Sequence, residues 1–155
     1  MPPVQTSYTP FMRKALLGMK ADMAPSLILS RFIETAGGIG FGLAVAQGTG
    51  DRQVRLGGTG PFVGATLLDL AAGATLLAPP TTPDQYQQND LAAIMKKGSI
   101  WVQADGAVTT TGIVTYTQAT GRFGAKAVAA GIVQIADAQF ETAGADGDLV
   151  LLRLS

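Results

Sequence analysis

Glycine and proline interrupt the apolar residues of this chain at short intervals. The 155 residues include 20 glycines and 8 prolines, and the apolar runs between them are short. Short apolar runs bounded by turn residues about every ten positions are typical of β-sandwiches and barrels. A strand–helix alternation is not apparent. The sequence therefore predicts an all-β fold, a small barrel or jelly-roll-like sandwich, with residues 26–155 as a single β domain.

The segments expected to form strands are rich in branched and aromatic residues, which favour a pleated, half-buried surface. They are residues 26–35, 41–46, 62–68, 113–117, 132–136 and 149–154. The glycine-rich turn at 36–42 lacks the spacing of a dinucleotide-binding or P-loop motif, so we interpret it as a structural turn.

Residues 90–104 contain the only tryptophan of the chain. Two apolar runs, 91–95 and 100–102, flank the polar residues 96–99, which predicts two sheet-building runs around a glycine turn or bulge with both lysines exposed. Trp101 faces away from Ile100 and Val102 in an alternating strand. It is therefore either a core residue of the opposite face or an interface anchor, since tryptophan buries a large area.

Residues 1–25 differ from the rest and are expected to form an N-terminal arm. Three prolines in the first ten residues favour an extended leader. Met12, Leu16, Met19 and Met23 then recur at helical spacing, which predicts a short helix that Pro25 ends. This partly helical arm either packs on its own domain or docks on a neighbouring subunit, where flexible methionines suit an adaptable contact.

Composition excludes many kinds of active site. The chain has no histidine and no cysteine, so disulfides, serine triads with an imidazole base and ordinary zinc centres are excluded. Its 11 basic and 11 acidic residues cancel, without the basic cluster that nucleic-acid binding needs. No apolar run is long enough to span a bilayer, and the N-terminus does not resemble a secretory signal. We expect no nucleic-acid or membrane partner.

Carboxylates are the remaining candidates for chemistry. Asp146 and Asp148 lie in a turn that lacks the other ligands of a calcium loop. A carboxylate-dependent hydrolase would need two scattered acidic residues to converge in one cleft. We therefore predict no catalytic residue, metal ligand or cofactor. Two alternatives stay open: a β-barrel that encloses a small apolar ligand, and such a hydrolase.

Short segments that follow one another along most of the chain carry a family resemblance. They are Tyr8 with residues 15–22 (ALLGMKAD), 41–48 (FGLAVAQG), 62–64, 86–90, 97–102 (KGSIWV) and 138–154. In this order and spacing they resemble the structural cement, or head-decoration, proteins of tailed bacteriophages. Residues 69–83 and 125–131 match no motif of that family.

The resemblance implies a non-enzymatic virion protein, assembled in the host cytoplasm, on the exterior of the capsid. Such proteins associate as dimers or trimers and clamp neighbouring major capsid proteins. Residues 1–25 are then expected to supply much of the lattice contact. The predicted interface residues, which combine apolar anchors with charge, are Tyr8, Phe11, Met12, Arg13, Lys14 and Trp101.

Overall fold

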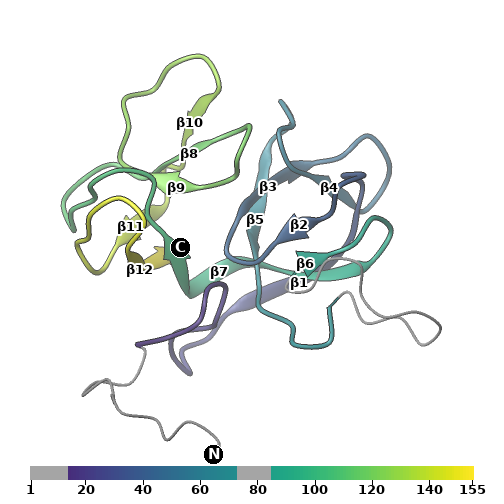
Figure 1. The fold of residues 1–155 in the computed structure, drawn as a ribbon, viewed down its shortest axis with the longest axis horizontal. Coiled ribbons are helices and arrows are strands. Elements are labelled where there is room, and N and C mark those ends of the chain that lie inside the picture. The colour runs from purple at the N-terminus through teal and green to yellow at the C-terminus, as the bar shows by residue number, and fades with distance from the viewer. Residues whose placement is uncertain (1–13, 73–84) are drawn as a thin grey trace, which may run out of the picture.

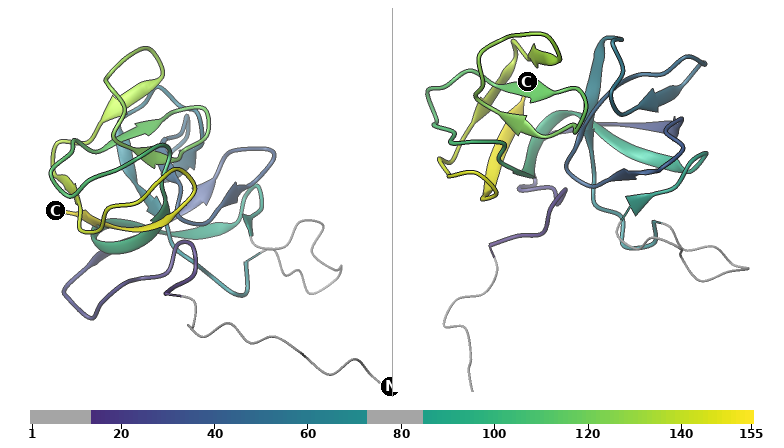
Figure 2. Two further views of the ribbon diagram at one scale, coloured as in Figure 1. Left: turned by 60° about the vertical axis from the view of Figure 1, so that its left-hand side comes forward. Right: turned by 45° about the horizontal axis from the view of Figure 1, so that its top comes forward.

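The computed structural model describes residues 14–72 and 85–155, and within them every regular element is a β-strand (Figures 1 and 2). The strands are β1 (Leu27–Ile33), β2 (Ile39–Gly40), β3 (Ala44–Gln47), β4 (Gln53–Arg55), β5 (Phe62–Thr66), β6 (Gln85–Tyr86), β7 (Leu91–Gln103), β8 (Thr115–Thr117), β9 (Phe123–Gly124), β10 (Ile132–Gln134), β11 (Ala138–Phe140) and β12 (Leu149–Leu154). The predicted all-β class is confirmed.

Five strands close a mixed barrel. Their order is β1-β4-β3-β5-β7, and β7 pairs back to β1. Only the β1–β4 pair of this ring is parallel. Ile33, Val45, Val54 and Ile94 fill the interior and are fully buried. The short β2–β6 ladder belongs to the same core, where the ring of Tyr86 packs edge-on against Phe41.

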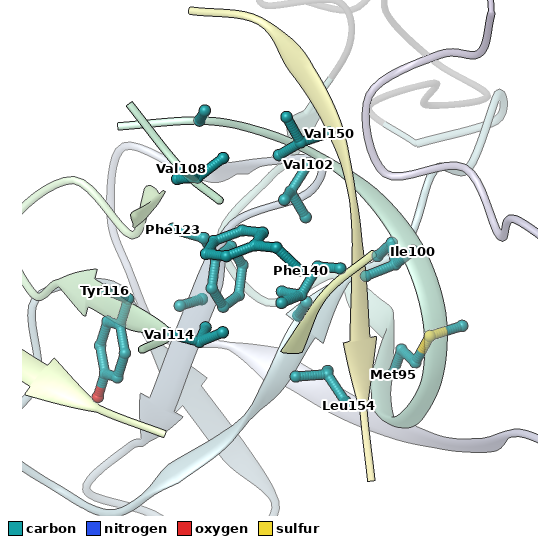
Figure 3. Close-up of a cluster of buried hydrophobic side chains, with 14 of the residues drawn as sticks. Met95, Ile100, Val102, Val108, Val114, Tyr116, Phe123, Phe140, Val150 and Leu154 are labelled. Atoms are coloured by element: carbon teal, nitrogen blue, oxygen red, sulfur yellow. The ribbon is translucent and has the colours of Figure 1, made fainter. Parts of the chain in front are cut away.

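The second part of the molecule, here called lobe two, lies beside the barrel (Figure 1). The C-terminal half of β7 pairs with β12, and β12 pairs with β11. A separate three-stranded sheet, β10-β8-β9, completes the lobe. Figure 3 shows Ile100, Val102 and Val150 directed into the space where Phe123 and Phe140 meet. Each large side chain buried there contributes about 1.5–3 kcal/mol of hydrophobic stabilisation.

Strand β7 joins the two cores. Its first half pairs with β1 and β5 of the barrel, and its second half pairs with β12 of lobe two. The pairing with β1 skips Lys96, which forms a bulge. Gly98, with φ at +128°, follows this bulge. The sequence predicted two runs around a turn or bulge; the bulge is present, and the two runs form one continuous 13-residue strand.

The helix expected in the arm is a wrong prediction for its described part. Residues 14–25 contain no helix, and Lys20 instead forms an antiparallel bridge with Ile100 of β7. The free edge of β7 offers hydrogen bonds that an extended chain can use, and these replace the helical ones. Met12 lies outside the described residues. The division of the chain at residue 25 stays a prediction.

No helix in the described parts of the chain has the length and apolar character needed to cross a membrane.

Gly98→Ala is expected to lower the free energy of unfolding by about 1–3 kcal/mol. An alanine at this position would have to adopt an unfavourable φ. Its Cβ would lie 2.9 Å from the Ser26 Cβ and 3.2 Å from the Met95 Sδ. Gly37→Ala is the matched control, because nothing lies within 4 Å of its added Cβ. Urea denaturation measures both variants, and equal stabilities would contradict the role given to Gly98.

Candidate interaction surface

The sheet of lobe two has one face turned away from its core. We call this the outer sheet face, and its residues are Ser99, Trp101, Gln103, Leu149, Leu151 and Arg153. Strand alternation assigns them to this side, because Ile100, Val102, Val150 and Leu152 point into the core and are fully buried. The register pairs them across the sheet as Arg153 with Ser99, Leu151 with Trp101, and Leu149 with Gln103.

Trp101 lies at the middle of the outer sheet face. Its side chain is half-buried and belongs to neither of the two buried apolar clusters. Leu151 is its direct cross-strand neighbour and is also half-buried. The two side chains thus form an apolar centre on an otherwise more polar face. Of the two interpretations of Trp101, a core residue is wrong, and an interface anchor stays a prediction.

The described part of the arm is held along the edge of this face. The Gly18 N–H donates to the Trp101 carbonyl at 2.8 Å, and the Trp101 N–H donates to the Met19 carbonyl at 3.0 Å. The Gly18 carbonyl in turn accepts from the Leu68 N–H at 2.8 Å, so this segment bridges lobe two and the barrel. A Cβ on Gly18 would lie only 2.7 Å from the Phe41 Cβ. The arm therefore has a fixed root.

Of the predicted interface residues, the structure describes Lys14 and Trp101. Lys14 is exposed and lines a hollow of about 410 Å³ together with Asp148 and Leu149. The structure therefore brings Lys14 and Trp101 to the same side of lobe two, although they are far apart in the sequence. Tyr8, Phe11, Met12 and Arg13 lie outside the described residues.

A hollow with several charged side chains lies at the other end of the outer sheet face, and the sequence did not predict it. Its volume is about 430 Å³, and its charged lining residues are Asp22, Lys97, Glu141 and Arg153. Arg153 forms an ion pair with Glu141 at 3.8 Å. These residues meet because β12 pairs with β7, and no local pattern in the sequence predicts that register.

The described acidic side chains make hydrogen bonds within turns and between loops. The Asp90 carboxylate accepts from the Gln87 N–H at 2.8 Å, and that of Asp146 accepts from the Gly106 N–H at 2.9 Å. Glu34 accepts two hydrogen bonds from Thr49, which together with Arg55 lower its pKa. Among residues 14–72 and 85–155, no three acidic side chains gather where they could hold a metal ion.

Asp105 is the centre of a charged cluster in lobe two. Its carboxylate accepts from the Lys126 ammonium at 2.7 Å and from the Thr117 hydroxyl at 2.9 Å, with Arg122 at 4.0 Å. Burial alone would raise the pKa of Asp105, but these hydrogen bonds and charges outweigh it and hold the pKa below its ordinary value. The cluster joins loops that are distant in sequence, so we assign it a structural role.

The comparison with protein families identifies the chain. The model of the family described as "Structural cement protein (E217 gp24/Pam3 gp6)" matches residues 4–155. Because the match spans nearly the whole sequence, the chain belongs to the phage structural cement protein family. The resemblance found in the sequence is confirmed: this is a structural component of the virion capsid and not an enzyme.

A solved structure shows the same fold at low sequence identity. A chain from the structure titled "The capsid of Myoviridae Phage XM1" is similar with a TM-score of 0.72 and 14% identity, covering 97% of this chain and 96% of that chain. The head fiber gp8.5 N base of bacteriophage phi29 is more distant, with a TM-score of 0.45 and 12% identity over 84% of this chain and 95% of that one. No curated protein matches the sequence.

Asp105→Asn is expected to lower the free energy of unfolding by about 1–2 kcal/mol at pH 7. Because the folded-state pKa lies below the ordinary value of about 3.9, the carboxylate stabilises the fold above about pH 4, and this contribution disappears as the pH falls through the lowered pKa. The difference between wild type and variant should therefore shrink in acid. Urea denaturation from pH 7 to pH 3 measures it, with Asp51→Asn in an exposed turn as control. A difference that does not change with pH would contradict this assignment.

Proposed function

We propose that this protein binds the outer surface of the capsid lattice and clamps neighbouring major capsid proteins. The family membership supports attachment to a capsid. The observation that carries the finer proposal is the position of the arm root, which is fixed at the edge of the outer sheet face beside Trp101. Because the arm begins at the edge of the outer sheet face, the face and the arm can contact two neighbouring molecules at once.

The outer sheet face has the chemistry of a moderate binding surface. Trp101 and Leu151 form an apolar centre, and the exposed side chains of Gln103 and Arg153 lie around it. Protein interfaces commonly have this arrangement, in which a central aromatic anchor supplies much of the binding energy and a polar rim excludes water. We propose that this face lies against the shell.

The arm extends the contact beyond the body of the protein. Thirteen residues precede Lys14 and can span roughly 45 Å when extended. A compact chain of this length has a radius of gyration of only about 15 Å. An arm with this reach is long enough to cross to a neighbouring molecule on the shell. Its proposed contact residues are Tyr8, Phe11, Met12, Arg13 and Lys14.

A protein that binds only the assembled shell, and not its separated subunits, would strengthen the shell. A ligand that binds one state of an equilibrium stabilises that state by mass action, so a bound clamp favours the closed shell over its separated subunits. The chain has a formal net charge of zero, which limits repulsion between many copies packed together. We propose that copies associate as dimers or trimers on the capsid exterior, after synthesis in the host cytoplasm.

The barrel interior gives little support to the alternative of an apolar ligand. Ile33, Val45, Val54 and Ile94 converge there, and each is fully buried against the others. A five-stranded barrel filled in this way has its interior occupied by its own side chains.

Trp101→Gln is expected to weaken capsid binding by about 10- to 100-fold, as loss of a central aromatic anchor does. Val128→Gln is the control, because Val128 is also apolar and is 59% exposed in a loop of lobe two. Co-sedimentation with capsids that lack this protein measures both, and thermal denaturation verifies that both variants fold. Equal binding by the two variants would remove the outer sheet face from the proposed contact.

Deletion of residues 1–13 tests the arm without damage to its root. A deletion through Pro25 would also remove the Gly18–Trp101 and Ala21–Ser99 hydrogen bonds and so disturb the fold. We expect the shorter deletion to leave the melting temperature nearly unchanged and to weaken capsid binding by about tenfold or more, because a multivalent contact loses one of its parts. Undiminished binding would show that the arm has no such role.

A further inference from the structure

An apolar groove lies between the arm root and the barrel. Its volume is about 440 Å³, and it is lined by Leu16, Leu17, Gly40, Phe41, Leu43, Leu68 and Leu70. Two of these side chains are open to solvent, since Leu70 is 88% exposed and Leu16 is 44% exposed. Single exposed leucines are ordinary, but an apolar lining gathered in one groove makes this groove a candidate interaction site.

The lining determines which chemistry an occupant of the groove would need. None of the residues that line the groove carries a charge, so a charged segment would lose its hydration there without compensation. The partner must be an apolar segment narrow enough for a groove of this volume. An extended peptide with one or two large apolar side chains meets that requirement.

Residues 1–13 of this chain have these properties. They read MPPVQTSYTPFMR, with large apolar or aromatic side chains at Tyr8, Phe11 and Met12 and a single charge at Arg13. Three prolines favour an extended backbone, which reduces the entropy lost when the segment is ordered in a groove. The arm is thus chemically complementary to the groove.

The direction of the chain favours the groove of another copy. Leu16 and Leu17 line the groove, but two residues earlier Lys14 lies beside Asp148 and Leu149 of lobe two. The chain, followed towards its N-terminus, therefore leads away from its own groove. An extended arm of roughly 45 Å is long enough to reach a neighbouring molecule.

We propose that the apolar groove binds residues 1–13 of a second copy of this chain, with Phe11 and Met12 as its anchors. The proposal deepens the proposed function and rests on it in one respect: the arm acts on the lattice by linking neighbouring copies. Each copy has one arm and one groove, so the contact is head-to-tail and can close into a ring, and a ring of three copies is one of the states expected for this protein. Neighbouring copies on the shell would then hold one another in place.

Photo-crosslinking of the full chain tests this directly. The variant Phe11→benzoylphenylalanine carries a photoreactive side chain in the arm. Copies of it labelled with ¹⁴N and with ¹⁵N are mixed and crosslinked in two states, free at high concentration and bound to capsids. We expect mixed-isotope crosslinks between residue 11 and peptides that contain residues 16–17, 40–43 or 68–70. Leu70→Asn should reduce their yield by about tenfold, the loss expected from one leucine anchor. Met23→Asn is the control, because Met23 is 97% exposed and lies outside the groove.

The outcomes separate this proposal from the proposed function. Crosslinks within single copies would place the arm in its own groove, and crosslinks to capsid protein alone would assign the arm to the shell; either result overturns the proposal. So would the absence of crosslinks to groove peptides, or equal yields from Leu70→Asn and Met23→Asn. Failure to co-sediment with capsids would instead contradict the proposed function, while mixed-isotope crosslinks in the free protein would still support arm exchange.

Discussion

Strand β7 is the constraint on which the rest of the structure depends. Ala92 and Ile94 belong to the barrel core, whereas Ile100 and Val102 belong to the core of lobe two, and all four are almost completely buried. One backbone therefore serves two hydrophobic cores, and it changes direction at the Lys96 bulge and Gly98. The same strand presents its remaining edge to residues 18–21. The orientations of the barrel, of lobe two and of the arm root all depend on the path of strand β7.

Local sequence patterns predict the strands well where one element is both apolar and clearly bounded. Residues 149–154 form β12 as expected, because a polar turn precedes a strongly apolar run. Long-range pairing limits the other predictions. The arm carries a helical spacing of leucine and methionine, but Gly18 approaches Phe41 and Leu68 too closely for a side chain, and the edge of β7 captures the chain as an extended segment. Tertiary contacts, which the local spacing of side chains does not reveal, therefore replace the predicted helix with an extended segment.

The interaction surface could be predicted only in part for the same reason. Strand alternation alone places Trp101 opposite Ile100 and Val102, and the structure bears this out. The hollow that unites Asp22, Lys97, Glu141 and Arg153 depends on the β7–β12 register and on the docking of the arm root. The apolar groove likewise combines Leu16 with Phe41, Leu68 and Leu70, which no spacing rule relates. The described carboxylates serve turns, contacts between loops and ion pairs, which agrees with a non-enzymatic family.

In the proposed attachment, the outer sheet face and the arm hold this protein on the outside of a capsid. Electron microscopy of intact particles at a resolution that shows side chains tests it most directly. We expect density for this chain on the outer surface, with Trp101 and Leu151 against the major capsid protein and residues 1–13 crossing to a neighbouring copy. A chain bound with its outer sheet face open to solvent, or located inside the shell, would contradict it.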